Sequence, residues 1–142
     1  MNHLIKLIFL ISITFLNSAN AQNTNKILFK VNSKVFTALD LEIRKNYLKI
    51  ILMNSEIEKK EFINTILFGE EFDNKYFQLD NNIINEMYLN IKDNYENKND
   101  DQNLKNIYLK LSQKQIIKNI TYDYKKKIIL ENYLNKKRDI IF

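Results

Sequence analysis

Neighbouring acidic side chains are the residues of this chain best suited to acid–base chemistry. They occur at Glu70-Glu71, at Asp100-Asp101 and in the run Glu56, Glu58 and Glu61. Two carboxyl groups can act as general acid and general base when their surroundings separate their pKa values. Each of these groups falls on the exterior of an expected helix, in a first helical turn or in a loop, where carboxylates are ordinarily hydrated. We therefore expect no catalytic carboxylate pair.

The residue types that are missing restrict the chemistry further. The chain has no cysteine, one histidine (His3) and one glycine (Gly69). Without cysteine or further histidines, the usual nucleophile–base pairs and zinc sites cannot be assembled. One glycine is too few for a glycine-rich phosphate loop. A glycosylation sequon is present at 119–121, but it lies in an expected helix. We expect neither enzymatic activity nor a metal ion or cofactor.

Aromatic side chains are the more informative feature, because the chain holds 8 tyrosines and 9 phenylalanines. Most of the rings are expected in the core, and some could line a groove that holds extended or apolar peptide segments. A tyrosine suits this task because its ring contacts apolar groups while its hydroxyl reaches a peptide backbone. The candidate peptide-binding residues are Phe68, Phe72, Tyr76, Tyr88, Tyr95, Tyr108, Tyr122 and Tyr124.

The first 21 residues are typical of a cleavable secretory signal peptide. A short n-region with Lys6 precedes the apolar run 7–16, and the pattern Ala19-x-Ala21 provides the small residues that signal peptidase requires. The apolar run is shorter than the roughly twenty residues that a spanning helix needs, although an uncleaved anchor is the alternative. We expect export to the periplasm, cleavage after Ala21 and a mature domain at residues 22–142 without a membrane span.

A β-hairpin and a helix are expected at the start of the mature domain. Two β-prone runs, Ile27–Val31 and Lys34–Phe36, flank Asn32-Ser33, and asparagine tolerates the left-handed conformation of a tight turn. Thr37 can cap the helix that follows to about residue 53, and Asp40 completes a box-like arrangement three residues later.

Four further helices are expected from apolar residues at spacings of three and four. The first is capped by Ser55 and reaches Tyr76, and the second is capped by Asp80. A loop at 96–102 precedes a short third helix at 104–111. The fourth is a long helix at 113–138 that is capped by Ser112. Gly69 lies within the first of these helices, where it marks either a close helix contact or a kink. The predicted fold class is mainly α, with a short hairpin followed by about five helices.

The segment Ile27–Arg44 resembles the start of the amino-terminal domain of SurA-type periplasmic chaperones. That domain opens with a strand ending in Val-Asn, a short second strand, then Thr or Ser, Asp-Leu and often an arginine. The matching positions here are Val31, Asn32, Val35, Thr37, Asp40, Leu41 and Arg44. The stretch 104–130 is also similar to the end of that domain, so the resemblance covers nearly the whole mature chain.

The resemblance implies a domain that binds unfolded outer-membrane polypeptides. Family members usually continue into parvulin-type prolyl isomerase domains, for which this chain has no room, so it implies no isomerase activity. It also implies a homodimer or a partner chain, because the carboxy-terminal segment that covers the family's helices is missing. A dedicated envelope adaptor that binds one partner protein is the alternative function.

The charge distribution leaves a third interpretation open. Residues 22–113 carry 13 basic and 14 acidic groups, whereas residues 114–142 carry 8 basic and 3 acidic groups. Such a basic end can attract nucleic acid or an anionic membrane. We expect no nucleic-acid binding from an exported protein whose sequence is lysine-rich throughout. Peripheral membrane binding through Lys125–Lys127, 136–138 and the apolar end 140–142 remains an alternative.

Overall fold

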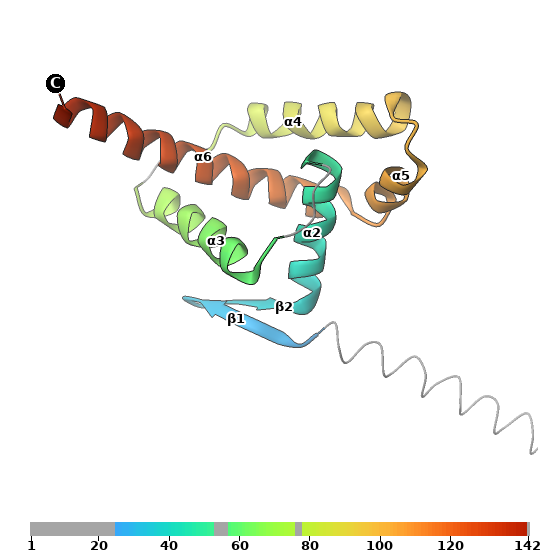
Figure 1. The fold of residues 1–142 in the computed structure, drawn as a ribbon, viewed down its shortest axis with the longest axis horizontal. Coiled ribbons are helices and arrows are strands. Elements are labelled where there is room, and N and C mark those ends of the chain that lie inside the picture. Colours follow the sequence, from blue (N-terminus) through green and yellow to red (C-terminus); the bar gives the residue numbers. More distant parts are fainter. Residues whose placement is uncertain (1–24, 53–56, 76–77, 142) are drawn as a thin grey trace, which may run out of the picture. The chain divides into compact units, whose positions relative to one another are not determined.

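The computed structural model describes residues 25–52, 57–75 and 78–141, and this part of the chain is mainly helical (Figure 1). A two-stranded antiparallel hairpin precedes five α-helices, which confirms the predicted fold class. The elements are β1 (Ile27–Val31), β2 (Lys34–Thr37), α2 (Ala38–Leu52), α3 (Lys59–Asn74), α4 (Asn81–Asp93), the π-helical turn η1 (Asn94–Lys98), α5 (Gln102–Leu109) and α6 (Gln113–Ile141). The chain divides into two units, residues 1–42 and 43–142, and their boundary lies inside α2.

The hairpin of the first unit is built around a two-residue turn. Asn32 has a φ of 51°, the left-handed conformation that was expected of it. Phe29 pairs with Phe36 across the strands, and their rings stack with centroids 4.9 Å apart. This cross-strand aromatic pair favours the observed register.

The passage from β2 into α2 contains a reciprocal cap. The Asp40 backbone amide donates to Thr37 Oγ1 at 3.3 Å, and the Thr37 amide donates to Asp40 Oδ2 at 2.9 Å. The Thr37 hydroxyl also donates to Asp40 Oδ2 at 2.8 Å. The aspartate thus takes the place that glutamate or glutamine has in the usual capping box.

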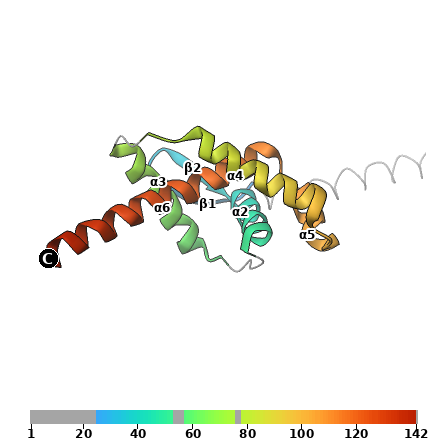
Figure 2. The same ribbon diagram turned by 90° about the horizontal axis from the view of Figure 1, so that it is seen from above.

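Helix α6 forms the centre of the second unit, with α3 packed along one side and α4 along the other (Figures 1 and 2). Ile116, Ile120 and Ile129 of α6 are at most 1% exposed. Phe62 and Phe72 of α3 are also buried. The core of this unit is therefore made by apolar residues that recur along helices, as the sequence pattern indicated.

Three of these helices begin with side-chain caps. Asp80 Oδ1 accepts from the amide of Asn82 at 2.9 Å at the start of α4, and Ser112 Oγ accepts from that of Gln115 at 3.3 Å at the start of α6. Both caps were predicted. Asp101 caps α5 in the same way, inside a segment that the sequence analysis assigned to a loop.

The beginning of α3 differs from the prediction. The helix begins at Lys59, and Glu58 occupies the N-cap position without a side-chain hydrogen bond to the first turn. Glu58 therefore precedes the helix and does not belong to its first turn. The predicted cap Ser55 and the predicted end Tyr76 lie outside the described residues.

The loop predicted at 96–102 is largely helical. The chain continues from α4 into η1, and only 99–101 separate this turn from α5. The reason is tertiary: the Tyr95 hydroxyl donates to the Ile50 carbonyl at 2.5 Å, and its ring stacks on Tyr108 with centroids 5.2 Å apart. These contacts hold a polar segment in a helical conformation that its own sequence does not favour.

Gly69 is buried in α3, on the side that faces α6. A Cβ atom built at this position would have Lys125 Cδ as its nearest neighbour, 3.9 Å away. That distance is an ordinary van der Waals contact, so helix packing here does not require glycine.

We predict that Gly69→Ala raises the free energy of unfolding by about 0.5–1 kcal/mol, because alanine has the higher helix propensity and restricts the unfolded chain. Urea unfolding followed by circular dichroism measures the change. Asn64→Ala, at an exposed position of α3, is the control for a gain in helix propensity that does not involve a glycine. A destabilised Gly69→Ala protein would contradict the prediction.

Candidate functional site

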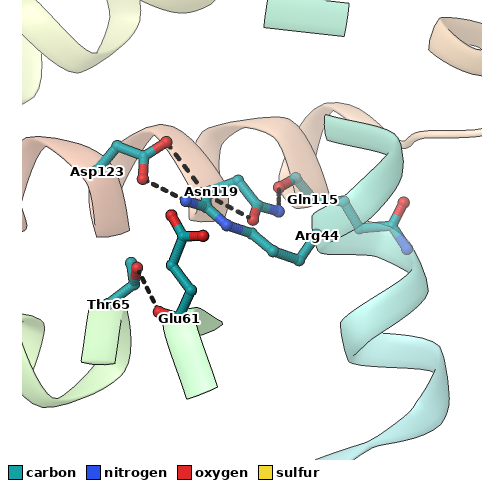
Figure 3. Close-up of polar contacts among 6 residues, drawn as sticks. All are labelled: Arg44, Glu61, Thr65, Gln115, Asn119 and Asp123. Atoms are coloured by element: carbon teal, nitrogen blue, oxygen red, sulfur yellow. Dashed lines mark hydrogen bonds and ion pairs between the residues drawn. The ribbon is translucent and has the colours of Figure 1, made fainter. Parts of the chain in front are cut away.

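A buried arginine on α2 joins this helix to α6. Arg44 is 3% exposed, and its guanidinium forms a forked ion pair with Asp123 of α6 (Figure 3). Nη2 lies 2.5 Å from Oδ1 and Nη1 lies 3.1 Å from Oδ2. A buried cation is costly unless it is paired and hydrogen-bonded, and the planar fork matches the carboxylate. Arg44 therefore requires Asp123 at this place.

Further polar groups of α6 lie beside this ion pair, whereas the buried Nε of Arg44 has no hydrogen-bond partner in the described part of the chain. Nη1 of Arg44 also donates to Asn119 Oδ1 at 3.3 Å, and Asn119 Nδ2 donates in turn to the Gln115 carbonyl at 2.8 Å. In Figure 3 the Glu61 side chain extends from α3 toward the same cluster. The cluster thus gathers polar groups from three helices that are far apart in sequence.

Tyr47 lies one turn beyond Arg44 and is 1% exposed. Its ring faces the guanidinium, with the Arg44 Cζ atom 5.4 Å from the ring centroid. Burial raises the pKa of the Tyr47 phenol well above its usual range, and the Asp123 carboxylate raises it further. The phenol therefore stays neutral beside the ion pair and donates a hydrogen bond to the Asp123 carboxylate.

A groove of about 400 Å³ lies between the second half of α2 and the α4–η1 segment. Its lining is mostly apolar, with two amide side chains. The lining residues are Tyr47, Ile50 and Ile51 from α2, Met87, Asn90 and Ile91 from α4, and Asn94 and Tyr95 from η1. The Tyr95 hydrogen bond to the Ile50 carbonyl joins the two walls of the groove.

The two amides have a spacing that suits an extended peptide. Asn90 and Asn94 are four residues apart along a helical segment, a rise of about 6 Å. Two residues of an extended strand rise by about 6.6 Å. An asparagine amide both donates and accepts, so each can bond to a peptide group. The spacing of the two amides is therefore close to that of two peptide groups two residues apart in an extended chain.

The structure places the predicted aromatic residues in different environments. Tyr95 is the candidate that lines the groove, and Tyr108 stacks on it. Phe72 and Tyr88 are buried, whereas Phe68, Tyr108, Tyr122 and Tyr124 are half-buried. Tyr76 lies outside the described residues, as do the predicted cleavage residues Ala19 and Ala21.

Sequence reasoning missed most of the groove. Met87 and Ile91 are among the apolar residues whose spacing predicted this helix, but nothing marked them as groove residues; Met87 is 37% exposed and both line the groove. The asparagine pair was not singled out. Two amide side chains four residues apart, just after Met87 on the same helical segment, were the feature of the sequence that could have indicated the groove.

Glu71, one of the acidic residues considered for catalysis, has structural partners. Glu71 forms an ion pair with Lys75 at 2.6 Å and accepts a hydrogen bond from the Tyr133 hydroxyl at 2.6 Å. The hydrogen bond from Lys75 lowers the pKa of the Glu71 carboxyl. Residues 25–52, 57–75 and 78–141 contain no cluster of three or more His, Cys, Asp or Glu side chains that could hold a metal ion.

Each helix in the described part of the chain is too short or too polar to cross a bilayer. Comparison of the chain with models of known families, with curated proteins and with solved structures finds no match. The groove and the ion pair beside it must therefore be interpreted from their own geometry.

We predict that Asp123→Leu lowers the free energy of unfolding by about 3 kcal/mol, because it leaves the Arg44 cation buried without a counter-charge. Arg44→Met should lower the free energy of unfolding less, because the Asp123 side chain that it leaves unpaired is 27% exposed and can be hydrated. The double variant Arg44→Met/Asp123→Leu should be more stable than Asp123→Leu alone. Urea unfolding measures all three.

Lys125→Met is the control, because Lys125 pairs with Asp73 at a carboxylate that is 51% exposed. Its cost should stay below about 1 kcal/mol. An equal decrease in the free energy of unfolding for Lys125→Met and Asp123→Leu would show that the Arg44–Asp123 ion pair stabilises the fold no more than an exposed ion pair does.

Proposed function

We propose that this protein is a periplasmic chaperone-like domain that binds unfolded outer-membrane polypeptides, without prolyl isomerase activity. The observation that carries the proposal is the apolar groove between α2 and α4–η1, with its two amides at strand-like spacing. The export signal and the resemblance of residues 27–44 to SurA-type chaperones support the compartment and the class of protein.

The chemistry of the groove favours unfolded strands as the bound molecule. Strands of outer-membrane barrels alternate apolar and polar residues with a period of two. In an extended chain, alternate side chains would contact Ile51, Met87 and Ile91, and the peptide groups between them would bond to Asn90 and Asn94. Binding that depends on the peptide backbone and on the spacing of apolar residues tolerates many sequences. A chaperone with many clients requires such tolerance.

Arg44 has a structural role that bears on the proposed binding surface. Arg44 ends the matching segment, and its ion pair with Asp123 fixes the half of α2 that forms one wall of the groove. A residue of the resembling motif thus acts on the position of the binding surface.

We predict that Met87→Lys weakens binding of an extended, alternating apolar–polar peptide about tenfold, equivalent to about 1.4 kcal/mol, because it places a charge among the apolar residues of the groove. Leu89→Lys is the matched control: Leu89 is 50% exposed on the same helix and is not among the groove residues. Fluorescence anisotropy with a labelled peptide measures both. Equal affinities of the two variants would exclude the groove as the binding site.

The chaperone activity itself is measured by aggregation of a urea-unfolded porin on dilution. The mature protein in several-fold molar excess should suppress aggregation, and Met87→Lys should suppress it less than Leu89→Lys. An absence of suppression by the wild-type protein, together with one stoichiometric partner in a pull-down, would instead support the envelope adaptor.

A further inference from the structure

The second half of α6 carries an apolar patch that the described part of the chain leaves more than a third exposed. Leu130, Tyr133 and Leu134 are 39%, 43% and 61% exposed, and their spacings of three and four residues place them on one face of the helix. In Figures 1 and 2 the carboxy-terminal end of α6 extends beyond α3 and α4. We call these three residues the α6 patch.

Lysines surround the α6 patch. Lys126 and Lys127 lie one turn before Leu130, and Lys136 lies three residues after Tyr133. The segment 124–136 contains four lysines and a single acidic residue, Glu131. Lys127 is paired with Glu131 at 3.9 Å, so the positive charge of the border comes from Lys126 and Lys136.

Besides Lys127, two lysines close to the patch have contacts within the protein. Lys125 is paired with Asp73, and the Lys75 ammonium lies 4.7 Å from the centroid of the Tyr133 ring. The Tyr133 hydroxyl is held by Glu71. Tyr133 thus has its apolar ring and its polar end in fixed positions, an arrangement suited to the boundary between water and hydrocarbon.

The positive charge around the α6 patch favours one of two possible binding partners. A second copy of the chain, paired through a two-fold axis, would place the same lysine border against itself, which is unfavourable. A layer of anionic headgroups is complementary to that border, and the leucines can enter the acyl boundary beneath it. We propose that the α6 patch binds the surface of a membrane that contains anionic lipids.

This proposal is independent of peptide binding, because the α6 patch and the groove share no residue. It also relocates the membrane contact that the sequence suggested. Lys125 is used within the protein, and the exposed apolar residues that carry the contact are those of the α6 patch.

Flotation of the mature protein (residues 22–142) with vesicles tests the proposal. One set contains phosphatidylcholine with a third of phosphatidylglycerol, and the other contains phosphatidylcholine alone. The protein should float with the anionic vesicles and remain behind with the neutral ones, and binding should weaken as salt is raised. Flotation with neither set, or equally with both, would overturn the proposal.

Variants locate the contact. Leu134→Asp should reduce anionic-vesicle binding at least fivefold, whereas Leu109→Asp, at a leucine of α5 that is 75% exposed, should not. Lys126→Glu/Lys127→Glu should abolish binding. Lys110→Glu/Lys114→Glu, which changes the net charge equally at exposed positions, should retain most of it. Equal losses in the two charge variants would indicate unspecific attraction and contradict an α6 site.

Two further measurements complete the test. Circular dichroism should show native helix content in all variants, since every substituted side chain is at least partly exposed. Analytical ultracentrifugation without lipid should show a monomer. A dimer that Leu134→Asp dissociates would assign the patch to a second copy and overturn the membrane proposal.

Discussion

The buried charge of Arg44 is the constraint on which the helical unit depends. A guanidinium that is almost completely removed from solvent must have its counter-charge beside it, and Asp123, 79 residues later in the chain, provides it. Apolar packing alone would leave the helices free to shift along one another, whereas a two-bond fork has one favourable geometry. The ion pair therefore specifies which part of α6 lies beside α2.

The groove is a consequence of this placement. The two turns of α2 that follow Arg44 carry Tyr47, Ile50 and Ile51, and these form one wall. The other wall is held by Tyr95, whose hydroxyl bonds to the Ile50 carbonyl from the widened turn η1. A polar network thus supports a mostly apolar surface without lining most of it.

Local signals in the sequence predicted the fold well and the site poorly, for physical reasons. The left-handed Asn32 and the caps Asp80 and Ser112 act within a few residues, so they could be read from the chain. The η1 turn depends on tertiary contacts of Tyr95 and was predicted as a loop. The partner of Arg44 could not be identified, because helical periodicity tells which face is buried and not which helix covers it.

The most direct measurement of the central claim, that the groove binds extended polypeptide, is methyl NMR of residues 22–142 titrated with an unfolded porin strand. Methyl signals of Met87, Ile51 and Ile91 should shift in a saturable manner, whereas those of Leu130 and Leu134 should stay unchanged. A peptide of the same composition with its apolar residues in one block should bind more weakly. Shifts confined to Leu130 and Leu134, or none at Met87, would contradict the claim.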